Sequence, residues 1–214
     1  MPKLFDIKEL SDSYVKLVKS TKELDVEVEV SLEKKKTGIA TGLAFLDHML
    51  ETIAWGACMS IGVSVNVKRK LTATITEDVG ITLGAALSQL FELKSKAGID
   101  GAGAGLFALD DALARAMVSV EGRRNIFVGL DAEGAKSERV EDLYTSDCVA
   151  FLEGLSQGLK ATIHLDILKG QEPHHCWEAA SRALGEAIRG VFKKNPWRPA
   201  SDNPYYAEEG LALL

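Results

Sequence analysis

The sequence is poor in cysteine and proline, and it contains no apolar run long enough to cross a membrane. Its three cysteines are odd in number and lie in or beside apolar stretches, which argues against a disulfide framework and for a reducing cytoplasm. The first residues, 1–6, lack the apolar core of a signal peptide. We therefore expect a cytoplasmic protein without a membrane partner.

An excess of positive charge is also missing. The chain has 25 lysines and arginines against 31 aspartates and glutamates, a formal net charge of -6. Nucleic-acid-binding domains usually carry a basic face, and the basic runs at 34–36 and 68–70 are too short to follow a phosphate backbone. We interpret these runs as solvated loops or strand ends and expect no nucleic-acid partner.

Hydrophobic periodicity predicts a mixture of helices and strands. Alternation with period two indicates strands, and apolar residues at spacings of three and four indicate helices. The glycine-rich segment 98–105 is expected to be a flexible connection, and the segment from 195 an extended arm. The strands predicted in this way are 25–32, 61–67, 118–120, 126–128 and 163–167, and the helices are 44–57, 77–93, a helix patterned on 149–155, and 175–193.

The two halves of the chain can be overlaid on one another. Residues 49–65 align with 151–167, and residues 77–87 align with 178–188 after one gap. A repeat of about a hundred residues is too long for a solenoid and indicates a duplicated half-domain. The order of strands and helices in each half predicts an α+β layer with helices on one face of a sheet. We expect half-domains at 1–97 and 98–194, forming one compact unit, and a C-terminal arm at 195–214.

A metal-ligand pattern opens the last predicted helix. His174 and His175 are adjacent imidazoles, and the carboxylate of Glu178 follows three residues later. This combination and spacing are typical of transition-metal sites.

The same pattern is largely absent from the first half. Glu77 aligns with Glu178, but Ala73 and Thr74 occupy the positions of the two histidines. Conversely, His48 lies on the predicted helix 44–57, and the matching position of the second half is Ala150. The overlay thus predicts a duplicated metal scaffold that has lost part of its ligand set.

Four segments resemble the motifs of one enzyme family. Residues 37–50 are similar to the helix-start motif of imidazoleglycerol-phosphate dehydratases, and residues 77–81 to the end of their first histidine-pair motif. Residues 109–115 match the central segment of the family, and residues 174–179 resemble its second histidine-pair motif. The resemblance runs in order from about residue 21 to 189, most of the chain.

The resemblance implies two pseudo-symmetric halves, as in ribosomal protein S5 domain 2, assembled into trimers and larger cubic shells. It also implies a metal-dependent hydro-lyase of histidine biosynthesis, in which manganese binds a small phosphorylated imidazole and a carboxylate helps to move protons. The implied metal ligands are His48, His174, His175, Glu178 and Glu77, the implied catalytic carboxylates are Glu23 and Glu178, and the implied phosphate-binding residue is Arg123.

The missing ligands leave the activity open. Ala73, Thr74 and Ala150 replace metal ligands, and residues 199–203 lack the phosphate clasp of the family. One hypothesis is a dehydratase-like enzyme with reduced or altered activity on that substrate or an analogue. The alternative is a catalytically silent paralogue (a pseudoenzyme) that acts as a scaffold, regulatory subunit or small-ligand binder. A third possibility is that the chain assembles together with an active homologue. For the cofactor, we expect manganese at one site only or at no site.

Structural interpretations compete for individual residues. Glu178 could stabilise the start of the last helix through its dipole, and Glu77 could cap a helix. Arg123 could form a surface salt bridge, and Glu23 belongs to a strand rich in acidic residues.

Overall fold

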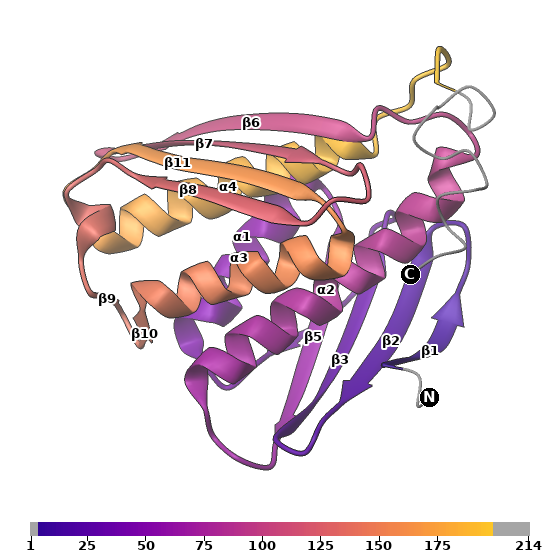
Figure 1. Cartoon of the computed structure of the whole chain (residues 1–214), viewed down its shortest axis with the longest axis horizontal. Helices are drawn as coiled ribbons and strands as arrows, with labels where there is room; N and C mark the ends of the chain where they lie inside the picture. Colours follow the sequence, from indigo (N-terminus) through magenta and orange to yellow (C-terminus); the bar gives the residue numbers. More distant parts are fainter. Residues whose placement is uncertain (1–3, 199–214) are drawn as a thin grey trace.

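In the computed structural model, which describes residues 4–198, the long helices lie between two β-sheets (Figure 1). The first sheet has the order β1-β2-β3-β5-β4, and the second has the order β6-β7-β11-β8. The first sheet contains β1 (Phe5–Leu10), β2 (Tyr14–Ser20), β3 (Leu24–Ser31), β4 (Ile39–Ala40) and β5 (Ser60–Val67). The second contains β6 (Ala102–Leu109), β7 (Ala112–Ser119), β8 (Asn125–Leu130) and β11 (Thr162–Lys169).

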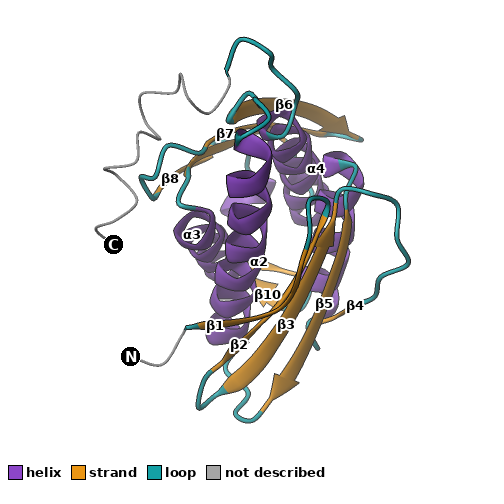
Figure 2. Ribbon diagram, turned by 90° about the vertical axis from the view of Figure 1, so that its right-hand side faces the viewer, coloured by secondary structure: helices purple, strands orange, loops and turns teal. Residues whose placement is uncertain are grey.

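The helices carry the contacts between the halves. They are α1 (Ala44–Ala57), α2 (Thr72–Ser95), α3 (Thr145–Leu159) and α4 (Pro173–Val191). A short hairpin of β9 (Arg139–Val140) and β10 (Leu143–Tyr144) precedes α3, and a 3-10 turn spans Gly134–Lys136. Figure 2 shows the helical layer between the two sheets. No helix within residues 4–198 has the length and apolar character that a membrane span requires.

The sheet topology confirms the internal duplication. The first half runs β2-β3-β4-α1-β5-α2 and the second runs β6-β7-β8-α3-β11-α4. In each half a hairpin is followed by a strand antiparallel to its second arm, β5 on β3 and β11 on β7. In each half this strand also has a parallel neighbour, β4 beside β5 and β8 beside β11. Among the strands of residues 4–198, β1 has no counterpart in the second half, and it extends the edge of the first sheet.

Each sheet buries one face against the helices, as the alternating pattern predicts. In β3 the side chains of Val26, Val28 and Val30 are fully buried, while Glu27 and Glu29 between them lie on the outer face. Helix α2 packs against β2 and β3, and α4 packs against β6 and β7.

Glycines allow the helices of the two halves to touch through their backbones. A Cβ atom on Gly56 of α1 would lie 2.8 Å from the Arg182 carbonyl oxygen of α4. A Cβ atom on Gly158 of α3 would lie 2.1 Å from the Ile81 carbonyl oxygen of α2. Because the overlay of the halves pairs Gly56 with Gly158, the two helix crossings are equivalent.

The α2–α3 crossing has additional glycine contacts. A Cβ atom on Gly80 would lie 2.2 Å from the carbonyl oxygen of Phe151, and one on Gly154 would lie 2.2 Å from that of Glu77. The equivalent positions in the α1–α4 crossing are Ser181 and Thr52, which carry side chains. Helices α2 and α3 accordingly contact one another more extensively than α1 and α4 do.

The prediction of a flexible connection at 98–105 is wrong from Ala102 onward, because β6 begins there. The glycines serve close packing: a Cβ atom on Gly103 would lie 2.1 Å from the Ala187 carbonyl oxygen, and one on Gly105 2.0 Å from that of Ala183. Only a strand without side chains at these positions can lie this close to α4. Strands β1 and β2 were not predicted, and most of the predicted arm, 199–214, lies outside the described residues.

A buried ion pair joins the first sheet to α2. The Lys19 ammonium donates a hydrogen bond to the Asp78 carboxylate, and these residues are 6% and 7% exposed. Buried charges are tolerated only when they are paired in this way.

Candidate metal centre

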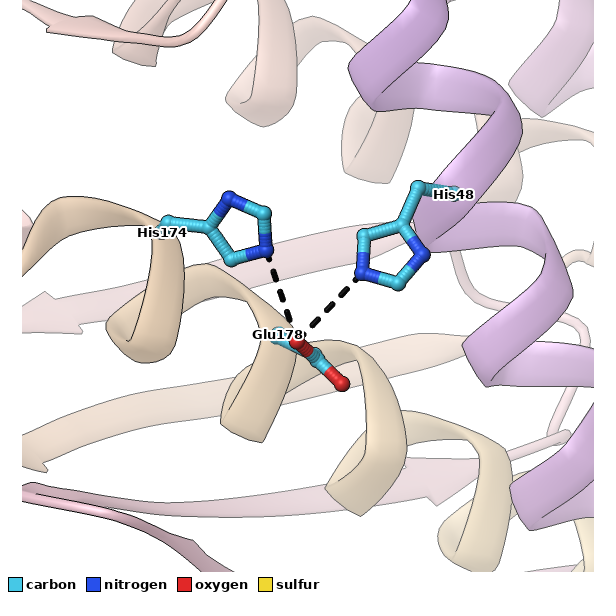
Figure 3. A group of neighbouring side chains, drawn as sticks. All are labelled: His48, His174 and Glu178. Carbon is cyan, nitrogen blue, oxygen red and sulfur yellow. Dashed lines mark hydrogen bonds and ion pairs between the residues drawn. The ribbon is translucent and has the colours of Figure 1, made fainter.

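Three potential metal ligands converge where α1 meets α4 (Figure 3). The Nε2 atom of His48 lies 3.3 Å from Oε2 of Glu178, and the Nε2 atom of His174 lies 3.5 Å from the same oxygen. One ligand atom from each residue lies within 4.8 Å of the other two. His48 belongs to the first half, and His174 and Glu178 belong to the second. The crossing of α1 and α4 brings the three side chains together.

Helix geometry explains the arrangement on α4. His174 and Glu178 are four residues apart, so they lie on the same face of the helix. The helix begins at Pro173, and the side chain of Glu172 caps it by accepting the backbone N–H of His175. Phe45 of α1 packs edge-on against the His174 ring at 5.2 Å between centroids, which limits the rotation of that ring.

Glu178 is buried and remains a carboxylate. Burial raises its pKa, but hydrogen bonds from Arg182 and His48 outweigh this effect, and the net pKa lies below the ordinary value. The Arg182 guanidinium donates to Oε1 from Nη2 at 2.7 Å and from Nε at 3.1 Å. Oxygen Oε2 is therefore the one directed at both histidines.

The donor set fits a divalent transition metal. Two imidazoles and one carboxylate form the ligand combination that suits manganese, iron or zinc, with coordination positions left for a substrate. The negative Oε2 atom of Glu178 faces one nitrogen of each imidazole, so the space between the three side chains attracts a cation. His48, His174 and Glu178 are thus the residues that could hold one.

His175 faces away from this group. Its Nδ1 atom lies 2.9 Å from Oδ1 of Asp111, its Nε2 atom lies 3.5 Å from Asp110, and its ring centroid is 6.3 Å from that of His174. Asp111 also accepts the backbone N–H groups of Gln171 and Glu172 at the start of α4. The structure therefore does not bring His175 together with His48 within one chain.

The His175–Asp111 contact predicts a pH dependence. The hydrogen bond to Asp111 raises the pKa of His175, and the Gln171 N–H followed by His175 lowers the pKa of Asp111 to about 2. The stabilisation from His175 is complete below its ordinary pKa of 6.5 and is lost as the pH rises through the raised value. The stabilisation from Asp111 is present above its ordinary pKa of 3.8 and is lost as the pH falls toward 2.

We expect the substitution Asp111→Asn to lower the pKa of His175 in metal-free protein, measured by NMR titration of the imidazole protons. The stability difference between wild type and variant should be largest between about pH 4 and 6.5 and should shrink at higher pH. Asp12→Asn, in the turn between β1 and β2, is the control and should leave the titration of His175 unchanged. An unaltered midpoint in Asp111→Asn would contradict the assignment of this ion pair.

The other candidates lie apart from the three converging ligands. Glu77 is exposed on α2, and Ala150 of α3 is half-buried, at the places equivalent to Glu178 and His48. Glu23 lies in the turn between β2 and β3, where its carbonyl oxygen accepts the N–H groups of Lys68 and Arg69. Arg123 is exposed in the connection between β7 and β8. Their roles in metal or substrate binding stay predictions.

Three residues at the site were not foreseen. Arg182 could have been found, because it follows Glu178 by four residues on the same helix face. Glu141 contacts Nδ1 of His174 at 2.9 Å, and Asp142 accepts two N–H groups at the start of α1. Both belong to the β9–β10 turn and carry no periodic signal.

The repeated halves and the imidazole–carboxylate group at their contact define a duplicated α+β protein with a candidate metal centre. A sequence model described as imidazoleglycerol-phosphate dehydratase matches residues 41–188. The chain belongs to the imidazoleglycerol-phosphate dehydratase family. The family match shows a dehydratase-like protein of histidine biosynthesis.

Individual relatives support the assignment. The imidazoleglycerol-phosphate dehydratase of Methylococcus capsulatus is 33% identical over 177 residues, covering 82% of this chain and 87% of that protein. The enzyme of Chloroherpeton thalassium is 36% identical over 183 residues, covering 83% and 90%. The crystal structure of IGPD from Pyrococcus furiosus superposes on this chain with a TM-score of 0.73 and is 32% identical in sequence. The alignment covers 84% of this chain and 94% of that one. The structure from Staphylococcus aureus also has a TM-score of 0.73, covering 85% and 99%, and at 22% identity it shows the fold alone.

Proposed function

We propose that the chain is a metal-dependent carbon–oxygen lyase that dehydrates imidazoleglycerol phosphate or a close phosphorylated imidazole analogue. The observation that carries the proposal is the convergence of His48 and His174 on one oxygen of Glu178. Manganese is the proposed metal, and a cytoplasmic homo-oligomer is the proposed form of the protein.

His48, His174 and Glu178 would hold the metal, which when bound supplies Lewis-acid stabilisation of an anionic substrate ring. Arg182 keeps Glu178 ionised through a forked hydrogen bond. His175 is held by Asp111 and faces away from this group, so we propose it as a ligand or proton carrier at a site shared with a neighbouring copy. Within one chain the site therefore has two imidazoles and one charged carboxylate as its ligands.

We propose roles for Arg123 and Glu23 at the contact between copies of the chain. Arg123 is exposed and Glu23 is half-buried, and neither belongs to the group of three converging ligands. We propose that Arg123 binds the phosphate and Glu23 moves a proton at the site of a neighbouring copy. These two roles would require the trimer or larger cubic assembly that we expect.

One metal per chain is proposed in place of the two implied by the family resemblance. At the equivalent place, where α2 meets α3, Glu77 alone remains of the three ligands, because Ala150 of α3 and Ala73 of α2 occupy the positions that match His48 and His174. The same loss favours the second candidate function, a silent paralogue that acts as a scaffold, regulatory subunit or partner of an active homologue.

Metal analysis and a dehydratase assay decide between these functions. Protein purified with manganese and without chelator is expected to retain about one ion per chain and to convert imidazoleglycerol phosphate. The absence of bound metal and turnover would support the silent paralogue. Two ions per chain would contradict the single-site proposal. Complementation of a dehydratase-deficient strain provides the cellular test of the substrate.

A further inference from the structure

The β9–β10 turn touches both helices that carry the proposed ligands. Glu141 Oε1 lies 2.9 Å from Nδ1 of His174 on α4. The neighbouring Asp142 accepts the backbone N–H groups of Ala44 at 2.7 Å and Phe45 at 2.9 Å, at the start of α1. Two consecutive side chains of one tight turn thus reach two different helices.

We propose that Glu141 and Asp142 are positioning residues for the metal centre, a role that rests on the proposed metal-binding function. Glu141 fixes the tautomer and the orientation of the His174 ring. Asp142 fixes the start of α1, and through it the place of His48 relative to α4.

The tautomer follows from the chemistry of the partners. The carboxylates of Glu141 and Glu178 both accept hydrogen bonds, but Nδ1 of His174 lies 2.9 Å from Glu141 while Nε2 lies 3.5 Å from Glu178, so Nδ1 makes the hydrogen bond and carries the hydrogen. In a neutral ring Nε2 then has the free lone pair, and Nε2 is the atom 3.5 Å from Glu178 Oε2 in the converging group. Carboxylates that hold the distal nitrogen of a metal-bound histidine commonly have this function.

Arg182 orients Glu178 as Glu141 orients His174, through a charged partner that does not itself belong to the group of three ligands. Arg182 occupies Oε1, which leaves Oε2 for the group. Each of the two ligands on α4 therefore has one atom held by a charged partner and one atom directed inward. Such outer contacts reduce the freedom that metal binding would otherwise remove.

The backbone of Glu141 supports a role for its side chain. Its φ is +51°, a left-handed conformation that favours Gly or Asn and is uncommon for glutamate. The side chain is 57% exposed, so burial does not explain its presence. Its contact with His174 is the feature that a glycine or asparagine in this two-residue turn would not provide.

Asp142 substitutes for a missing local cap. The N-cap residue of α1 is Leu43, which offers no side-chain acceptor to the first turn. Asp142 supplies two acceptors from a segment almost a hundred residues away. The second of its donors belongs to Phe45, whose ring also packs on His174 at 5.2 Å. The start of α1 and the His174 ring are therefore fixed by the same turn.

The substitution Glu141→Asn tests the role of Glu141. Asparagine suits the left-handed backbone but is too short to repeat the contact with His174. We expect Mn²⁺ binding, measured by calorimetry, to weaken about 10- to 100-fold. The thermal midpoint should stay unchanged or rise, which a purely structural role would not produce. Glu153→Gln, on the exposed face of α3, is the control and should leave both measurements unchanged.

A second measurement does not require metal. Long-range ¹H–¹⁵N spectra of the metal-free wild type, above pH 7, should show His174 with its hydrogen on Nδ1, and Glu141→Asn should mix the tautomers. Wild-type affinity in Glu141→Asn, or an unchanged tautomer, would overturn the positioning role. Failure of the wild type to bind Mn²⁺ would refute the proposed function instead, and the tautomer would still test this inference.

Discussion

The substitution Glu178→Gln is expected to weaken Mn²⁺ binding by about 100-fold or more without unfolding the protein. Loss of an outer partner of a metal ligand typically weakens affinity about 10- to 100-fold, and Glu178 is a proposed ligand itself. Both histidines face its Oε2 atom, so the change removes the charge shared by the whole group. Glutamine has the same shape and can still accept a hydrogen bond from Arg182. Calorimetric titration of metal-free protein measures the loss, and circular dichroism checks the fold.

The internal duplication supplies the control for this experiment. Glu77 is the counterpart of Glu178 in the first half, but Ala73 and Ala150 stand beside it in place of histidines. Glu77→Gln should therefore leave Mn²⁺ affinity and stoichiometry unchanged. Equal losses in the two variants would show that the first half still contributes to the metal site and would contradict the single-site proposal.

Removing one partner of the Lys19–Asp78 pair is expected to cause the largest loss of stability. Lys19→Met leaves the Asp78 carboxylate, 7% exposed, without its cation, a change that typically costs about 3–5 kcal/mol. This is a large part of the roughly 5–15 kcal/mol by which a typical native protein is stable. Urea unfolding should show a lower midpoint with a similar slope.

The double substitution Lys19→Met with Asp78→Leu should recover most of the lost stability, because it removes the unpaired charge. The exposed pair Lys68–Asp25 is the comparison, since Lys68→Met should lower the urea midpoint far less than Lys19→Met does. A Lys19→Met variant as stable as the wild type would show that water reaches Asp78 in solution.

The sequence predicted the helices and the duplication because both depend on periodic patterns. The bounds predicted for α1 coincide with Ala44–Ala57, and α4 begins two residues earlier than expected. The segment 98–105 was misinterpreted because glycine is usual both in loops and in strands that a helix approaches closely. Only the position of α4 against β6 distinguishes the two cases.

The candidate site was predicted in part for the same reasons. His48, His174 and Glu178 were named from motif spacing and repeat comparison, and the α1–α4 crossing places them together. His175 was grouped with them, but successive residues on a helix point about 100° apart, which directs it to Asp111. Contacts from the β9–β10 turn depend on tertiary structure, so no local pattern could indicate Glu141.

The glycine-rich crossing of α2 and α3 fixes the distance between the helices at the place equivalent to the candidate metal centre. Gly80 and Gly154 bring backbone against backbone where the other crossing has Ser181 and Thr52. Position 73 is exposed and position 150 is half-buried, so the close approach of the helices, and not a lack of room for histidines, distinguishes this place from the candidate metal centre. Enlarging Gly80 or Gly154 first would force main-chain atoms apart and destabilise the fold before any ligand was gained. A return to two equivalent centres would thus need a wider crossing as well as restored histidines, and widening the crossing carries a penalty.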